Sequence, residues 1–189
     1  MKDLTNYFFE VGNLQRVANS GWWLIGEKNP NSVAEHVHRA STIAFCLAHL
    51  EDKDPFKASS ITLFHDNHES RVTDLHKVAQ KYVDLKKVDV KVLQDQTYSL
   101  PNQIKESIQT LFNEYHTQST AEGIIARDAD LLEYGLKARE LMVQGNVAAK
   151  DWLDNINKLV KTDSGIKLAK SLYKADPNDW WKDLKNIKR

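Results

Sequence analysis

Residues 32–50 read SVAEHVHRASTIAFCLAHL and carry the clearest helical pattern in this chain of 189 residues. Ser32 followed three positions later by Glu35 is the pattern of a capping box, in which each side chain binds the other residue's backbone N–H at a helix start. Behind this box, apolar residues recur every three or four positions and share one helical face: Ala40, Ile43, Ala44, Leu47 and Leu50. The stretch therefore predicts an amphipathic helix.

The same period recurs along most of the chain. Asp54-Pro55 predicts an N-cap and a first-turn proline for a helix that runs to His65. Ser119 and Glu122 predict a second capping box, which starts a long helix that Gly145 can end. Further helical patterns cover residues 102–116, 152–160 and 166–173, and Asp176-Pro177 starts a last turn, whereas residues 82–99 have no clear period. Strict alternation over six or more residues is hard to find anywhere, so the sequence predicts an all-α protein.

Composition and charge narrow the class of protein further. The chain has no linker rich in Pro, Gly or Ser and no internal repeat, so we expect a single-domain helical bundle over residues 1–189. Its motifs lie in a core of about 14–140, with C-terminal helices at 146–189 packed on it. Lys plus Arg and Asp plus Glu both number 26, which argues against a nucleic-acid partner. No segment has the pattern of a membrane span or a leader peptide, so we expect a cytoplasmic protein without a membrane partner.

The cysteine content excludes two kinds of site. Cys46 is the single cysteine, so neither an intramolecular disulfide nor a metal site with several cysteines can form. Because Cys46 lies in the apolar run 43–48, we expect its side chain to fill the core.

Histidines are concentrated in one part of the sequence. Six of the seven lie from His36 to His76, and the run HDNHE at 65–69 follows the apolar run 61–64. Imidazole nitrogens and carboxylate oxygens suit a divalent metal, and polar groups on a buried helix need such a partner. Neighbouring positions on a helix diverge by about 100°, so His65 and Asp66 need ligands from other helices. His36 and the acidic string DADLLE at 128–133 are the candidates, which predicts a mixed nitrogen and oxygen site.

These motifs resemble those of the HD-domain metal-dependent phosphohydrolases, which are all-helical proteins. The resemblance rests on SVAEH at 32–36, HDNHE at 65–69, TDL at 73–75 and DADLLE at 128–133. LQR at 14–16, followed by Gly21-Trp22, points to the branch of 5′-deoxynucleotidases. The match spans about residues 14–140. It implies an HD-type helical bundle that hydrolyses nucleoside 5′-monophosphates with one divalent metal.

The resemblance also implies roles for individual residues. The metal ligands would be His36, His65, Asp66 and Asp130. Glu69 would take or relay a proton, Asp74 would be a second acidic residue of the site, and Arg16 would hold the phosphate. The implied cofactor is one divalent ion, with Mn²⁺ or Co²⁺ favoured and Mg²⁺, Zn²⁺, Ni²⁺ or Fe²⁺ compatible.

Several assignments stay open at the level of the sequence. Apolar periodicity places Asp128 nearer the buried stripe than Asp130, whereas the family string favours Asp130, which we adopt as the ligand. Trp22 and Trp23 are either a wall of the nucleoside site or packing residues, and we adopt Trp22 as a substrate-binding candidate. His38 and His68 are either near the metal or purely structural, and His49, His76 and His116 are taken as structural. Trp152 and Trp180-Trp181 are assigned to core packing or to a homodimer contact.

The position after Arg16 bears on the sugar. Some bacterial members of the family carry an aromatic residue there, which excludes a 2′-hydroxyl, whereas this chain has Val17. We therefore expect an incomplete preference for deoxyribonucleotides.

Two other functions remain as alternatives. One is an HD phosphohydrolase of a cyclic nucleotide or an alarmone, and the other is a non-catalytic regulatory module with a structural metal. Glu69 and Asp74 argue against the second alternative, because a structural metal needs only its ligands. The expected partner is a small nucleotide substrate.

Overall fold

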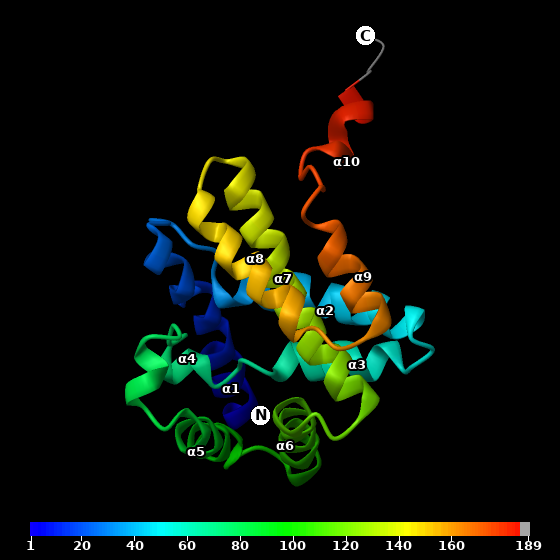
Figure 1. Ribbon diagram of the computed structural model, residues 1–189. Coiled ribbons are helices and arrows are strands. Elements are labelled where there is room, and N and C mark those ends of the chain that lie inside the picture. The colour runs from blue at the N-terminus through cyan, green and yellow to red at the C-terminus, as the bar shows by residue number, and fades with distance from the viewer. Residues whose placement is uncertain (186–189) are drawn as a thin grey trace.

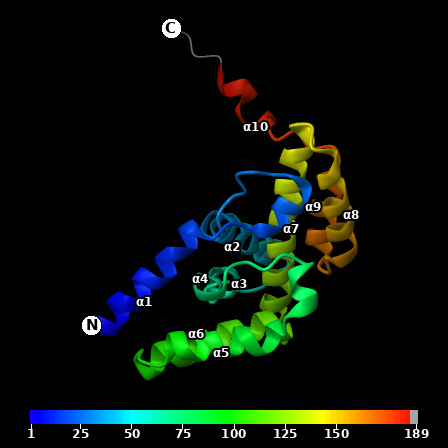
Figure 2. The ribbon, with the colours of Figure 1, turned by 90° about the vertical axis from the view of Figure 1, so that its left-hand side faces the viewer.

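Three helices form the centre of the protein: α2 (Val33–Leu50), α3 (Pro55–Phe64) and α7 (Ala121–Val143). The computed structural model describes residues 1–185. Over that range the regular secondary structure is helical, apart from an isolated antiparallel bridge between Ala18 and Ser32, which confirms the predicted all-α class. In Figure 2, α7 is the long vertical helix, with α2 and α3 on one side and α8 and α9 on the other.

The remaining helices surround this centre (Figure 1). They are α1 (Lys2–Gly12), α4 (Glu69–Val72), α5 (Leu85–Thr97), α6 (Asn102–Thr117), α8 (Lys150–Leu159), α9 (Asp163–Ser171) and α10 (Asp179–Lys182). The described residues also form five short 3₁₀ helices: η1 (Asn13–Arg16), η2 (Ser20–Ile25), η3 (Ala79–Tyr82), η4 (Val147–Ala149) and η5 (Asp183–Lys185). Helices α8 and α9 pack on α7, whereas α10 points away from the body.

The helix caps that position the site follow the sequence closely. Ser32 and Glu35 form the complete capping box at the start of α2, and Asp54 caps α3 with Pro55 in its first turn. The long helix α7 begins one residue later than predicted. Thr120, rather than Ser119, is its N-cap and accepts a hydrogen bond from Gly123 N, while Gly145 with φ +101° follows its end. These caps fix where α2, α3 and α7 start relative to their polar residues.

Gly123 allows α6 and α7 to approach closely. A Cβ atom at this position would lie 2.4 Å from the backbone oxygen of Glu114, which no other residue could tolerate without displacing backbone. The close approach places Tyr115, near the end of α6, against the buried polar face of α7.

Two expectations differ from the structure. Residues 85–97 form α5, although their sequence has no clear period. The buried face of α5 mixes Val92 and Leu93 with polar Asp89, Gln96 and Thr97, which weakens the hydrophobic signal. Cys46 is exposed on α2 rather than buried in the core, because the inward face of that helix is made by neighbouring residues such as Ala44 and Leu47.

The three tryptophan positions near the C-terminus also differ from one another. Trp152 is half-buried against Trp22, Trp180 is exposed on α10, and the ammonium of Lys185 lies 4.0 Å from the ring centre of Trp181. Among residues 1–185, no helix is both long and apolar enough to cross a membrane.

Candidate metal centre and substrate cavity

Side chains from three helices converge on one point in the centre of the protein. His36 comes from the first turn of α2, His65 and Asp66 follow α3, and Asp130 comes from α7. His65 Nε2 lies 2.9 Å from Asp66 Oδ2 and 3.7 Å from Asp130 Oδ1. His36 Nε2 lies 3.1 Å from Asp130 Oδ1 and 3.8 Å from Asp66 Oδ2. The fold thus brings together the four residues for which the sequence predicts a metal-binding role.

The orientation of both imidazoles is set by hydrogen bonds on their far sides. His65 Nδ1 donates to the carbonyl oxygen of Thr62 at 2.6 Å, and His36 Nδ1 lies 2.5 Å from Glu133 Oε2. Both Nε2 atoms therefore face the carboxylates of Asp66 and Asp130. When Nδ1 carries the proton of a neutral imidazole, Nε2 offers the lone pair that a metal requires.

The negative charges of the clustered carboxylates favour a cation between the four side chains. Burial lowers the pKa of His36, but Glu133 and Asp130 outweigh it and raise that pKa to about 10. His65 has its pKa raised to about 10 by Asp66 and Asp130 against the same effect of burial. His36 Nε2 is buried and forms no well-directed hydrogen bond within residues 1–185. Two nitrogens and two carboxylates with this geometry fit a divalent metal, which replaces the protons that otherwise hold the group together.

Asp130 and Asp128 have different environments, although they are two residues apart on α7. Asp130 Oδ2 accepts hydrogen bonds from Tyr115 Oη at 2.6 Å and Arg127 Nη1 at 2.5 Å. Burial raises the pKa of Asp130, but Arg127, His36 and His65 lower it well below its usual value. Asp128 turns to the other side and accepts hydrogen bonds from Lys161 N, Thr162 N and Thr162 Oγ1. Asp128 therefore joins α7 to the start of α9 rather than contributing to the cluster.

Two more acidic residues lie beside the cluster. Glu69 Oε2 is buried without a hydrogen-bond partner among the described residues. Burial, and then the charges of Asp66 and Asp74, raise the pKa of Glu69 well above its usual value. Asp74 Oδ2 accepts a hydrogen bond from Ser20 N at 2.6 Å, and burial raises its pKa as well. A carboxyl group with a raised pKa next to a metal-binding cluster is suited to proton transfer.

A cavity of about 770 Å³ opens next to these residues. Its wall includes Asp66, Glu69, Asp74 and Asp130, together with aromatic, apolar and basic side chains: Tyr115, Tyr134, Trp152, Leu24, Leu75, Leu131, Lys77, Arg127 and Lys158. Its size is within the range of cavities that hold small molecules.

The structure does not bring every predicted substrate-binding residue to this cavity. Trp22 is fully buried and packs against Tyr134 and Trp152, with ring centres 5.8 and 5.6 Å away. It therefore supports the cavity wall from behind, which corrects the expectation that Trp22 contacts the substrate. Trp23 is exposed. Arg16 is exposed at the end of η1 and is not among the residues that line the cavity.

Val17 also lies apart from the cavity. Its buried side chain packs with Leu14, Val33 and Val37, because the backbone bonds between this segment and the start of α2 turn it inward.

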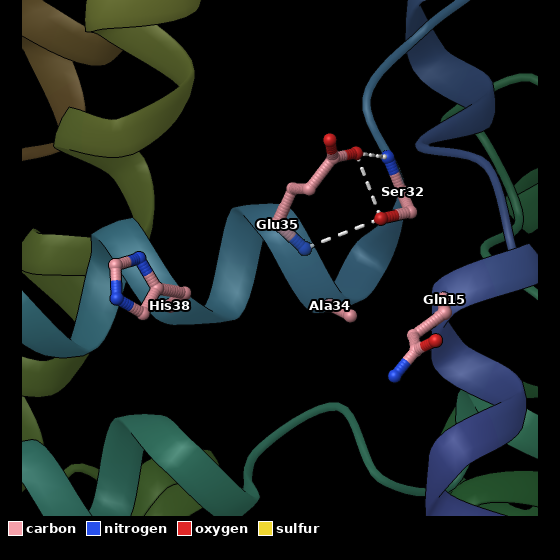
Figure 3. Close-up of a pocket in the computed structure, with 5 residues that line it drawn as sticks. All are labelled: Gln15, Ser32, Ala34, Glu35 and His38. Carbon is pink, nitrogen blue, oxygen red and sulfur yellow. Dashed lines mark hydrogen bonds between the residues drawn. The ribbon is translucent and has the colours of Figure 1, made fainter.

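The other histidines have varied positions. His68 Nε2 lies 3.3 Å from Asp89 Oδ1. His68, His76 and His116 all line the cavity, although a structural role was expected for the last two. His38 lies on the outer face of α2, at a separate shallow pocket that includes Gln15 and the capping box (Figure 3).

Glu133, Arg127 and Tyr115 contact the cluster, and the sequence reasoning did not single them out. Glu133 and Arg127 each lie three residues from Asp130, about one helical turn, so helical spacing around the ligand could have found them. Tyr115 comes from α6, and no sequence signal links that helix to the cluster.

Comparison with known proteins places this geometry in a family. Residues 11–170 match the HD domain family. The 5′-deoxynucleotidase HDDC2 of Xenopus laevis is 30% identical over 144 residues, which cover 74% of this chain and 69% of the relative. The 5′-deoxynucleotidase HDDC2 of Homo sapiens is 28% identical over 141 residues, 74% of this chain and 68% of the relative.

Solved structures agree with this match. A conserved hypothetical protein from Pyrococcus furiosus has 26% identity and a TM-score of 0.76, covering 90% of this chain and 99% of that chain. A protein from Pyrococcus horikoshii has 26% identity and a TM-score of 0.75 over 89% and 97% of the two chains. The resemblance inferred from the sequence motifs is thus confirmed, and the chain belongs to the HD domain family.

Proposed function

We propose that this protein is a metal-dependent phosphohydrolase that removes the 5′-phosphate from nucleoside 5′-monophosphates. The observation that carries the proposal is the convergence of His36, His65, Asp66 and Asp130, with both Nε2 atoms turned inward, at the wall of a cavity beside Glu69. The names of the relatives, 5′-deoxynucleotidases, support the same substrate class.

The residues divide the chemistry between them. A divalent metal held by the four clustered side chains would supply positive charge to the phosphoryl oxygens and lower the pKa of a water molecule. In the reaction, a water oxygen bonds to phosphorus, the bond from phosphorus to O5′ breaks, and O5′ takes a proton. Glu69 takes the proton from the water and passes it to the leaving oxygen. The negative charge of Asp74 contributes to the raised pKa of Glu69.

The cavity wall suits a nucleoside as well as a phosphate. Trp152, Tyr134 and Leu24 provide flat and apolar surface for a base, and acidic and basic groups lie around the cluster. The mixed nitrogen and oxygen donors favour Mn²⁺ or Co²⁺ over Mg²⁺, which prefers oxygen ligands alone. Zn²⁺, Ni²⁺ and Fe²⁺ remain compatible with the donors.

A substrate panel tests the proposal. Purified protein is incubated with deoxyribonucleoside and ribonucleoside 5′-monophosphates, cyclic nucleotides and a guanosine tetraphosphate, each with Mn²⁺, Co²⁺ or Mg²⁺, and phosphate release is measured. We expect release from the 5′-monophosphates and none from the Asp130→Ala variant. Turnover of only the cyclic nucleotide or the tetraphosphate would assign another phosphohydrolase activity. No turnover with any metal would favour a structural metal in a regulatory module.

The sugar preference can be measured in the same assay. Val17 packs in the core and does not line the cavity, so it places no steric barrier against a 2′-hydroxyl. An apolar wall alone rejects an added hydroxyl by a factor on the order of 10². We expect dAMP to be preferred over AMP by no more than this factor in kcat/KM. Absence of any AMP turnover would mean that another cavity residue excludes the hydroxyl.

A further inference from the structure

Arg127 connects the metal-binding cluster to the open cavity. It lies on α7, one turn before Asp130, and its side chain is 34% exposed. Nη1 donates to Asp130 Oδ2 at 2.5 Å and to Tyr115 Oη at 2.7 Å. Within residues 1–185, Nη1 makes all of the hydrogen bonds of this guanidinium, so Nε and Nη2 have no partner. Nη1 is therefore held in place, and Arg127 is among the residues that line the cavity.

An ordinary helix ion pair does not account for this arrangement fully. Residues three apart on a helix often pair, and such a pair would need only Nη1. However, Asp130 Oδ2 already accepts a hydrogen bond from Tyr115 Oη at 2.6 Å, so its orientation has a second support. The contact with Tyr115 also fixes the plane of the guanidinium, which leaves its remaining donors in a defined position.

The charges around the cavity indicate what the Nε and Nη2 donors of Arg127 could bind. Six carboxyl groups line the cavity: Asp66, Glu69, Asp74, Asp89, Asp130 and Asp151. A phosphate group carries negative charge and would be repelled by such a wall unless cations lie beside it. The lining contains three cationic side chains, Lys77, Arg127 and Lys158, and Arg127 is the one bonded to the cluster.

We propose that Arg127 binds the phosphate group of the substrate through Nε and Nη2 while Nη1 holds Asp130. This inference rests on the proposed function, because it places the phosphate between the metal-binding cluster and α7. A guanidinium matches the spacing of two phosphate oxygens and keeps its charge at all working pH values. The sequence resemblance gives this role to Arg16, which does not line the cavity.

The test measures binding of inorganic phosphate, the expected product, to the full-length protein loaded with Mn²⁺, by calorimetry. For Arg127→Gln we expect a loss of phosphate affinity of about 10- to 100-fold, the effect of losing hydrogen bonds to a charged group. Affinity for Mn²⁺, measured on metal-free protein, should fall by less than the phosphate affinity, because Tyr115 still donates to Asp130 in this variant. Arg127→Lys should recover part of the phosphate affinity, because it keeps the charge but loses the fork.

Three control variants separate the possible roles. Tyr115→Phe removes the other donor to Asp130 and one contact of Arg127, so it should weaken phosphate binding less than Arg127→Gln does. Arg71→Gln makes the same chemical change at an exposed arginine that pairs with Glu10 and does not line the cavity, so it should change neither affinity. Arg16→Gln tests the residue that the sequence favours.

Several results would overturn the inference. They are an unchanged phosphate affinity in Arg127→Gln, a parallel loss of phosphate and Mn²⁺ affinity in that variant, a loss in Arg16→Gln alone, or no phosphate binding by the Mn²⁺-loaded wild type. The parallel loss would make Arg127 only a support for Asp130. The proposed function fails separately, if no nucleoside monophosphate is hydrolysed, because phosphate binding is measured without turnover.

Discussion

At the scale of single residues, Glu133 shows how a side chain outside the donor set can control it. Its Oε2 lies 2.5 Å from His36 Nδ1, and its Oε1 accepts hydrogen bonds from Arg39 Nε and Nη2 at 3.0 and 2.7 Å. Burial raises the pKa of Glu133, but His36 and Arg39 lower it below its usual value, so the group is ionised. An ionised partner on Nδ1 holds the imidazole in place and makes Nε2 a better ligand.

We predict that Glu133→Gln weakens Mn²⁺ binding by about 10- to 100-fold, the range for partners of metal-ligating histidines. Glu140→Gln is the matched control, because Glu140 pairs with Arg39 but does not contact His36. Calorimetry on metal-free protein measures both variants. Equal affinities of Glu133→Gln and wild type would remove Glu133 from the metal centre.

Glu69 leads to a prediction about rate and pH. Replacing it with Gln keeps its shape but removes the titrating group, so we expect kcat to fall by about 10²-fold or more while metal stays bound. Because burial, Asp66 and Asp74 raise its pKa well above its usual value, the ionised form becomes the major form only at a higher pH than for a free glutamate. When this form accepts the proton, kcat/KM of the wild type should rise with pH, with a midpoint above that of a free glutamate.

The pH profile of the variant provides the check. Glu69→Gln should lose the rising limb, whereas a variant with an unchanged profile and rate would show that another group moves the proton. Metal content is measured in parallel, so that a lost metal is not mistaken for a lost proton acceptor.

The sequence predicted the cluster residues better than the substrate contacts. His36 and Asp130 lie within helices, and His65 and Asp66 directly follow one, and local caps set the starts of these three helices. The sequence motifs therefore indicated where these residues lie as well as which residues they are. Trp22 and Arg16 lie on 3₁₀ segments, where tertiary packing decides which way a side chain points. Trp22 fills a core site, and Arg16 stays exposed, for reasons that no local pattern contains.

At the scale of elements, α7 has two polar faces with separate roles. Its Asp130 face meets α2, α3 and α6, whereas Asp128 on the other side binds the backbone of Lys161 and Thr162 before α9. Periodicity correctly indicates that Asp128 is buried, but burial alone does not distinguish a metal ligand from a helix-connecting group. The local chemistry of the partner decides between these roles, and that partner comes from a distant part of the chain.

We therefore predict different effects for the two aspartates. Asp128→Asn should lower the free energy of unfolding by about 1–3 kcal/mol, because backbone donors lose a charged acceptor, and should leave Mn²⁺ affinity within about threefold. Asp130→Asn should mainly weaken Mn²⁺ binding. Urea denaturation of metal-free protein and calorimetry give the two quantities. Loss of Mn²⁺ affinity in Asp128→Asn with unchanged stability would reverse the assignment.

Helix α5 could not be predicted from the spacing of apolar residues in its sequence. Gln96 on its inner face donates to Glu10 Oε1, the Asn67 backbone oxygen and Ser70 Oγ. Polar contacts therefore hold this helix at positions where apolar residues would otherwise produce a helical period in the sequence. A helix that packs through hydrogen bonds has no amphipathic stripe to detect. For the same reason, the part of the fold predicted well is the part that packs through apolar faces, namely α2, α3 and α7.

At the scale of the whole molecule, the metal-binding cluster joins segments that are far apart in the sequence. His36 and Asp130 lie on α2 and α7, His65 directly follows α3, and these three helices contact one another. Helices α8 and α9 pack on the outer side of α7. Leu172, just after α9, is buried near Gly135 of α7, where an added Cβ atom would lie 2.9 Å from its side chain. Such contacts couple the C-terminal helices to the helices that carry the cluster.

From this coupling we predict that the chain unfolds in a single transition, as the one domain expected from the sequence, and that Mn²⁺ raises its melting temperature. A ligand that binds only the folded state at 100 times its Kd stabilises it by about 2.7 kcal/mol. For a protein of this size, that corresponds to a rise of about 5–10 °C. Asp130→Ala should melt in one transition as well, but without the shift. Two transitions by calorimetry, of which Mn²⁺ moved only one, would show that the C-terminal helices fold separately, because the ions would then stabilise only the unit that contains α2, α3 and α7.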